Sequence, residues 1–265
     1  MHPHHLIELA IAADPALIMD LIGKPGDEWQ KRLLRKRYMR MLLCCSRQAG
    51  KSTVTACFAL IEAICCAPIL ILVICPAARQ SKEFLRNVSR FRKKLGVKIT
   101  QESTAHIEFA NGSRVIALPS EEETIRGFSE VGLLILDEAS RIPDELYNSV
   151  KPMLAVSNGR IAVLSTPYGK RGFFHKEWTT GEDWERVMVT AEQCPRITKE
   201  FLDKERRDLG AIFFRQEYMC EFAELTNAVF SFDDVQAAMS HDVKPLFGVS
   251  MESDAISDKV KPLFQ

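Results

Sequence analysis

The segment from Cys45 to Ser52 contains the residue types that proteins use to hold the phosphates of a nucleotide. In the motif G-x-x-x-x-G-K-[ST], a loop between a strand and a helix surrounds the phosphates with backbone N–H groups. Gly50, Lys51 and Ser52 fit this motif, whereas Cys45 occupies the position of its first glycine. We predict that Lys51 reaches the β- and γ-phosphates of ATP and that Ser52 holds Mg²⁺. The alternative is a chance G-K-S sequence at the start of a helix, which only a second motif excludes.

Such a second motif lies downstream, where an apolar run from Gly132 to Leu136 ends in Asp137 and Glu138. A buried strand would bring both carboxylates to the edge of the sheet at which open α/β folds bind their ligands. Asp137 is then placed to hold Mg²⁺ through water, and Glu138 to act as the general base on the attacking water. Taken with the first motif, this pair predicts ATP hydrolysis rather than phosphate transfer to a second small molecule.

Ser165, Thr166 and Pro167 follow another apolar run. In P-loop ATPases that act on nucleic acids, polar residues at such a strand end sense the γ-phosphate and couple its loss to movement. A simple Thr-Pro turn is the alternative interpretation.

Two arginines and an aromatic–amide pair are further candidates. Arg47 lies inside the phosphate-binding loop and Arg126 precedes the Asp137 strand, so either is a candidate arginine finger. A surface salt bridge is the alternative for Arg126. Trp29 and Gln30 precede the first strand and could contact adenine, although a tryptophan that anchors a helix to the core fits the sequence equally well.

The hydrophobic pattern predicts the elements that must position these residues. Strands alternating with helices favour a mostly parallel sheet with helices on both faces. Asn111-Gly112 between two short apolar runs predicts an antiparallel hairpin added at one edge. The expected fold is therefore α/β, the three-layer ASCE or RecA-like fold of P-loop NTPases. We expect strands at 39–45, 69–75, 106–109, 113–118, 131–136, 160–164 and 187–190, and helices at 27–37, 53–67, 79–95, 143–150, 198–209 and 211–220.

Composition excludes several classes of protein. The 265 residues are 46% hydrophobic and have a formal net charge of zero, so nothing global indicates nucleic-acid binding. Basic runs at 31–40 and 86–94 fit solvated helix faces as well as phosphate contacts. No apolar run reaches the roughly 18 residues of a membrane span, and no secretory signal is visible, so we expect a cytoplasmic protein. The eight cysteines lack zinc-site spacing and are expected to be reduced and buried.

Six segments occur in an order that resembles the large terminase subunit of tailed bacteriophages. The form S-R-Q-x-G-K-S, with an arginine and without the first glycine, is fairly specific to that family, so Cys45 and Arg47 support the resemblance. It extends from about residue 27 to residue 230. The segments are Trp29-Gln30, Ser46–Ser52, Ile125-Arg126-Gly127, Leu136–Ala139, Ser165–Pro167 and Phe214–Tyr218.

The resemblance implies an ATP-driven motor that moves double-stranded DNA into a preformed capsid. Such a motor works as a homo-oligomeric ring at the portal vertex, in contact with the portal protein and the small terminase subunit. Its implied location is the cytoplasm of the bacterial host and, transiently, the portal of the procapsid.

The resemblance also implies a role for each residue of this sequence that matches a motif of the family. Lys51 and Ser52 would bind phosphate and Mg²⁺, Asp137 would bind Mg²⁺ and Glu138 would activate water. Either Arg47 or Arg126 would be the finger, which a neighbouring subunit can supply, and Ser165 to Pro167 would couple hydrolysis to movement. The expected nucleotide-binding residues are Trp29, Gln30, Ser46, Arg47, Gln48, Ala49, Gly50, Lys51, Ser52 and Thr53.

Family members normally continue into a nuclease domain with metal-binding carboxylates. The acidic residues Asp233-Asp234 and Glu252 to Asp254 are not presented by apolar strands. We therefore expect a motor domain at 1–225, a linker or the start of the nuclease domain at 226–265, and no nuclease activity from this chain.

Two other functions remain open at the sequence level. The chain could be a helicase-like, nucleic-acid-stimulated ATPase of related fold, although helicases usually pair two such domains. It could also be a prophage remnant that binds nucleotide without turnover, although Lys51, Asp137 and Glu138 are all present.

Overall fold

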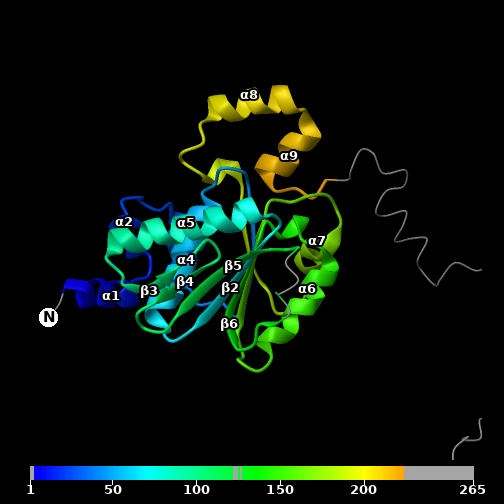
Figure 1. Cartoon of the computed structure of the whole chain (residues 1–265). Helices are drawn as coiled ribbons and strands as arrows, with labels where there is room; N and C mark the ends of the chain where they lie inside the picture. Colours follow the sequence, from blue (N-terminus) through cyan, green and yellow to red (C-terminus); the bar gives the residue numbers. More distant parts are fainter. Residues whose placement is uncertain (1–2, 122–124, 126, 224–265) are drawn as a thin grey trace, which may run out of the picture. The chain divides into compact units, whose positions relative to one another are not determined.

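The computed structural model describes residues 3–121, 125 and 127–223 (Figure 1). These residues belong to one compact unit, Met1–Thr226. The predicted boundary between residues 225 and 226 lies outside the described residues and stays a prediction. None of the helices within the described ranges is long and apolar enough to cross a membrane.

A central sheet of eight strands in the order β3-β4-β5-β2-β6-β7-β1-β8 organises the described residues. The strands from β5 to β8 in this order run parallel, whereas β4 pairs antiparallel with β5, and β3 pairs antiparallel with β4. The α/β fold predicted from the sequence is confirmed, including the antiparallel hairpin at one edge. The strands are β1 Arg40–Cys45, β2 Leu70–Cys75, β3 Ile99–Glu102, β4 His106–Phe109, β5 Arg114–Pro119, β6 Val131–Asp137, β7 Arg160–Ser165 and β8 Glu185–Val189.

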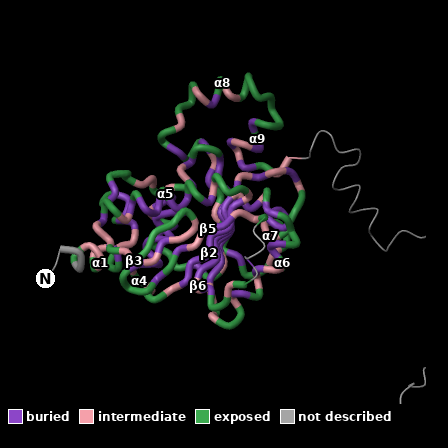
Figure 2. Tube along the Cα trace, viewed as in Figure 1, coloured by how far each residue is buried: buried purple, intermediate pink, exposed green. Residues whose placement is uncertain are grey.

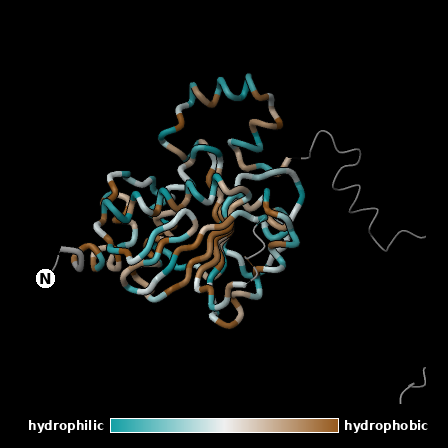
Figure 3. Tube along the Cα trace, viewed as in Figure 1, coloured by the Kyte–Doolittle hydropathy of each residue, from teal (hydrophilic) through white to brown (hydrophobic). Residues whose placement is uncertain are grey.

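Both faces of the sheet are buried, which explains why its central strands are continuously apolar. Successive residues of β1 alternate between two cores, with Leu43 packed on one side and Leu42 on the other. Every residue of β2 and β7 is buried. Figure 2 shows this burial as a block of purple strands, and Figure 3 shows the same strands as the most hydrophobic part of the chain.

Helices cover the two faces and form the outer layers. On one face, α4 and α5 pack on the sheet, and α1 to α3 pack against α4; α6 and α7 lie on the other face (Figure 1). The pair α8 and α9 packs around a small separate cluster of Leu202, Phe214 and Tyr218. The bounds are α1 Pro3–Ala13, α2 Leu17–Leu21, α3 Glu28–Arg35, α4 Lys51–Cys65, α5 Ala78–Leu95, α6 Asp144–Val150, α7 Gly172–Thr179, α8 Lys199–Leu209 and α9 Ala211–Met219.

The β4–β5 hairpin turns at Asn111-Gly112, as the sequence predicts. Gly112 has φ 84°, a conformation in which glycine is free of steric cost. The Asn111 side chain accepts a hydrogen bond from the Ser113 amide at 3.0 Å and donates to the Ala63 carbonyl oxygen at 2.8 Å, so the turn is fastened to the end of α4. The sequence pattern did not predict α1, α2, α7 or β3.

One buried ion pair joins α4 to the beginning of β7. The Arg160 guanidinium contacts the Glu62 carboxylate, and these side chains are 5% and 6% exposed. Arg160 also lies over the Phe58 ring, with its Cζ 5.7 Å from the ring centroid. Because each charge is removed from water, each depends on the other for compensation.

We expect Arg160→Met to lower the free energy of unfolding by about 3–5 kcal/mol, because it leaves the Glu62 carboxylate buried without a cation. The double variant Glu62→Leu/Arg160→Met removes both charges and should recover much of this loss. Urea unfolding measures both.

Arg35→Met is the matched control, because Arg35 pairs with Asp14 while their side chains are 49% and 31% exposed. It should cost about 1 kcal/mol or less. Equal losses in the Arg160 single variant and the double variant would contradict a dependence on charge compensation.

Candidate nucleotide site

The phosphate-binding loop lies between the end of β1 and the start of α4, as predicted. Gly50 immediately precedes α4 with φ 92°. This positive φ is what favours glycine here, and a Cβ at this position would also displace the end of the Gln30 side chain, whose nitrogen would lie 2.7 Å away. Cys45, by contrast, is the fully buried last residue of β1 and pairs with Val189 of β8. The position of the missing first glycine is therefore still part of the sheet and has no need of glycine.

A cavity of about 410 Å³ opens over this loop. It brings together residues from the loop, the end of β6, the segment after β7, the start of α5 and α9. Thr166 and Pro167 of the predicted coupling segment line it. Its other lining residues are Ser46, Arg47, Gln48, Gly50, Lys51, Ser52, Thr53, Gln80, Glu138, Arg141 and Glu217.

Lys51 connects the two predicted motifs. Its Nζ donates a hydrogen bond to Glu138 Oε1 at 2.6 Å and lies 3.3 Å from Asp137 Oδ1. The Lys51 side chain is 8% exposed. Burial by itself would lower the pKa of Lys51, but the Asp137 and Glu138 carboxylates outweigh it and hold that pKa above its usual value. Lys51 is therefore a fixed positive charge at the floor of the cavity.

The turn after Asp137 directs Glu138 toward the cavity. Glu138 has φ 54°, a left-handed conformation that is unusual for a residue other than glycine. Its amide donates to Asp137 Oδ1 at 3.0 Å. The short 3-10 helix η2, Ala139–Arg141, begins immediately afterwards. The turn thus separates the two adjacent carboxylates, with Asp137 ending the strand and Glu138 lining the cavity.

The predicted coupling segment is hydrogen-bonded to η2 through Ser140. The Ser140 hydroxyl lies 2.7 Å from the Ser165 hydroxyl and donates to the Thr166 carbonyl oxygen at 2.9 Å. The Ser140 amide donates to Ser165 Oγ at 3.1 Å. Any shift of the segment after β7 is therefore linked to the turn that carries Glu138.

Arg47 joins the loop to α9. Its guanidinium pairs with the Glu217 carboxylate, and its amide donates to the Glu217 carbonyl oxygen at 2.9 Å. The hydrogen bond with Glu217 is the main reason that the pKa of Arg47 is raised. Both side chains line the cavity, so the end of α9 forms part of its rim.

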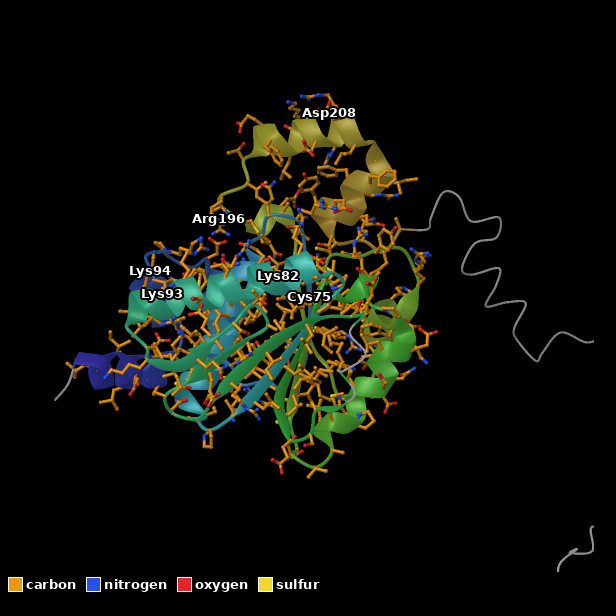
Figure 4. All side chains as sticks on the ribbon, viewed as in Figure 1. Cys75, Lys82, Lys93, Lys94, Arg196 and Asp208 are labelled. Carbon is orange, nitrogen blue, oxygen red and sulfur yellow. The ribbon has the colours of Figure 1, made fainter. Side chains whose placement is uncertain are left out.

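Trp29 and Gln30 are buried beside the loop and do not line the cavity. The Gln30 side chain accepts from the Asp27 amide at 2.9 Å, as in a capping box, and its nitrogen donates to the Gly50 carbonyl oxygen at 3.4 Å. Arg196, which precedes α8 (Figure 4), donates to the Ala49 carbonyl oxygen at 2.9 Å and pairs with Asp27 at 2.6 Å. These side chains support the loop from outside the cavity.

With this geometry established, comparison with known proteins assigns a family. Residues 42–237 match the family model for the terminase large subunit, T4likevirus-type, N-terminal part. The chain belongs to this family. It is 26% identical over 226 residues to the terminase large subunit of Escherichia phage T5, an alignment that covers 80% of this chain and 50% of that protein. A 28% identity over 127 residues relates it to the terminase large subunit of Thermus phage G20c, covering 41% of this chain and 26% of that one.

Solved structures agree on the fold. The large terminase ATPase domain of Thermus phage P74-26 superimposes with a TM-score of 0.68 at 20% identity, over 77% of this chain and 97% of that domain. The large terminase of a thermophilic bacteriophage, solved in complex with ADP, gives a TM-score of 0.62 at 15% identity, over 75% of this chain and 54% of that protein. This terminase chain spans about half the length of its phage T5 relative.

Several residues of this terminase site carry no recognisable sequence signal. Gln80, Arg141 and Glu217 line the cavity, and Ser140 and Arg196 support its walls. Only Glu217 lies in a segment that resembles the family, Phe214–Tyr218, and the sequence assigns it no role. Arg126, a predicted finger, lies outside the described residues. Ser46 and Ala49 are buried in the loop, whereas Ser52 is exposed toward the cavity.

We expect Ser140→Ala to lower the free energy of unfolding of this terminase chain by about 1–2 kcal/mol, because the Thr166 carbonyl and the Ser165 hydroxyl each lose a partner. Ser149→Ala is the control, since within the described ranges its hydroxyl bonds only to the Leu146 carbonyl of α6. That variant should cost about 0.5 kcal/mol or less. Equal unfolding free energies for the two variants in urea would show that Ser140 does not stabilise the segment after β7.

Proposed function

We propose that this terminase chain hydrolyses ATP in the cavity over the phosphate-binding loop and uses the energy to move double-stranded DNA into a capsid. The observation that carries the proposal is the contact of Lys51 with both Asp137 and Glu138, which places the two nucleotide motifs at one cavity. Family membership supplies the process that hydrolysis would drive. The proposed motor comprises residues 1–225.

In the proposed reaction, the backbone amides at the start of α4 bind the phosphates, and Lys51 neutralises the β- and γ-oxygens. Glu138 orients the attacking water and accepts its proton. The negative charge of the phosphates attracts Lys51, which is the cation that Glu138 contacts in this structure. Lys51 would therefore exchange a carboxylate partner for a phosphate partner when ATP binds.

The residues present fit a magnesium ion. Ser52, a residue with a hydroxyl group, lines the cavity, and Asp137 presents a carboxylate at the adjoining strand end. Hydroxyl and carboxylate oxygens together with phosphate oxygens are the ligands that Mg²⁺ prefers. When bound, the ion would neutralise charge on the phosphates. Ser52 and Asp137 are the residues we propose to hold it.

The remaining family roles are proposals for this chain. Ser165 to Pro167 would transmit loss of the γ-phosphate through their contact with Ser140. The active form would be a ring of identical subunits that contacts the portal protein, the small terminase subunit and DNA. It would act in the host cytoplasm and transiently at the procapsid portal.

We expect Glu138→Gln to lower the turnover of ATP by at least about 100-fold, because it removes the proposed general base, while nucleotide binding is retained. Lys51→Ala should abolish nucleotide binding itself. Phosphate release and equilibrium binding of ATP measure the two effects. Lys82→Ala is the control, because Lys82 is an exposed cation on α5 outside the cavity (Figure 4). Turnover that survives Glu138→Gln would remove Glu138 from this role.

The source of the arginine finger can be tested by mixing variants. If Arg126 acts on a neighbouring subunit, Arg126→Ala and Lys51→Ala proteins, each inactive, should recover turnover when mixed, because a Lys51→Ala subunit still supplies Arg126. Arg47 lines the cavity of its own subunit. A mixture of Arg47→Ala and Lys51→Ala should therefore stay inactive.

DNA packaging is tested separately from hydrolysis. The expected outcome is DNA-independent association with a portal protein and ATP-dependent uptake of duplex DNA by procapsids. Unwinding of a forked duplex without such uptake would instead assign the chain to the helicase-like class.

A further inference from the structure

Three side-chain cations line the cavity, and they differ in how their charges are compensated. Lys51 contacts the Asp137 and Glu138 carboxylates, and Arg47 pairs with Glu217. Arg141 forms no ion pair with any carboxylate in the part of the chain that the structure describes. Among the described residues, the Arg141 guanidinium is thus a cavity charge that no carboxylate neutralises, at a site that suits an anionic ligand.

Arg141 is held by an aromatic ring rather than by an acid. Its Cζ lies 4.3 Å from the centroid of the Tyr168 ring, the distance of a cation–π contact. Such a contact orients the guanidinium but leaves its full positive charge, and its N–H groups remain able to bind phosphate oxygens. The same ring also contacts Arg171, whose Cζ is 4.8 Å from the centroid. Arg171 does not line the cavity, so it provides a natural comparison.

The backbone places Arg141 beside the proposed general base. Arg141 is the last residue of η2, and its amide donates to the Glu138 carbonyl oxygen at 3.0 Å. Its neighbour Ser140 is fastened to Ser165 and Thr166. Glu138 must face the γ-phosphate to activate water, so this shared turn favours the γ-phosphate as the part of ATP that the Arg141 guanidinium would contact.

We propose that Arg141 binds the γ-phosphate of ATP in the cavity of its own subunit, and that Tyr168 is the residue that positions its guanidinium. This inference rests on the proposed ATPase function and adds to it a residue that discriminates ATP from ADP. Tyr168 directly follows Pro167. Its contact with Arg141 therefore joins the proposed coupling segment to a side chain that would bind the nucleotide. Arg141 is distinct from both predicted finger arginines, Arg47 and Arg126.

The first experiment compares ATP and ADP binding in full-length Glu138→Gln protein, in which turnover is suppressed. Arg141→Gln should weaken ATP binding by about tenfold or more, as expected for the loss of a charge-assisted hydrogen bond, and ADP binding by about twofold or less. Arg171→Gln, which alters the other cation at the Tyr168 ring, should change neither. Equal losses for ATP and ADP, or no loss for either, would overturn the proposal.

Failure of the proposed function gives a different result. If the Glu138→Gln parent binds neither ATP nor ADP, the ATPase proposal fails before Arg141 is tested. If the parent binds both and Arg141→Gln binds like the parent, only the role of Arg141 fails. A loss of DNA affinity with an unchanged ratio of ATP to ADP affinity would assign Arg141 to the DNA backbone and would also overturn the proposal.

Tyr168 provides a test of positioning. Tyr168→Phe retains the ring and should keep the preference for ATP over ADP, whereas Tyr168→Leu removes the cation–π contact and should reduce it. A merely structural role would instead weaken ATP and ADP binding together in Tyr168→Leu. That result would overturn the positioning role.

Mixing variants settles whether Arg141 acts within its own subunit. Arg141→Gln mixed with Lys51→Ala should show no recovery of turnover, because neither subunit has a complete cavity. Recovery would show that Arg141 acts on a neighbour and would overturn the assignment to its own subunit. If the Arg126→Ala mixture described above recovers turnover, it is the positive control for recovery.

Discussion

The ion cluster of Lys51, Asp137 and Glu138 is the interaction on which the site depends. Its members come from the first residue of α4 and from the end of β6 and the residue that follows it. Helix α4 is fixed by packing on one face of the sheet and β6 by burial on both of its faces, so the lysine and the carboxylates are held by packed elements. Desolvation makes such a cluster costly unless its charges are balanced. Here Lys51 balances the charges of Asp137 and Glu138. Lys51 and Asp137 are also residues that we propose to contact the triphosphate and the divalent ion.

The walls of the cavity are supported by side chains that do not line it. Neutral hydrogen bonds from Ser140 fix the segment after β7, and Gln30 and Arg196 hold the carbonyl groups of Ala49 and Gly50 away from the cavity. The Ser46 and Arg47 amides of the loop are bound as well, because they donate to the Val189 and Glu217 carbonyl oxygens. The loop is thus braced through both its carbonyl and its amide groups.

The fold and the floor of the site could be predicted because their signals are local. Apolar runs mark β1, β2, β6 and β7, and short segments after two of them supply Lys51 and Glu138. Strand β3 could not be predicted because its residues are partly or fully exposed and it exists through pairing with β4. Its sequence has no core-facing pattern of its own. Residues brought together across the chain also escape prediction from spacing. Glu217 meets Arg47 from 170 residues away, and Arg196 meets Ala49 from 147 residues away.

Some contacts of the site have no signal in the sequence. The sequence allows an adenine contact for Trp29 and Gln30, and in the structure the Gln30 side chain caps its own helix and supports Gly50. The role of Trp29 and Gln30 in adenine binding stays a prediction. Arg141 escapes prediction because an arginine shortly after an acidic pair has no distinctive pattern.

The contact between Arg47 and Glu217 has a consequence for the order in which the chain is made. The loop, β6 and β7 leave the ribosome well before α9, so a nascent chain that ends before Glu217 has the floor of the cavity without its rim. Biosynthesis of α9 completes the enclosure. The nucleotide cavity is therefore completed by the last helix that the structure describes.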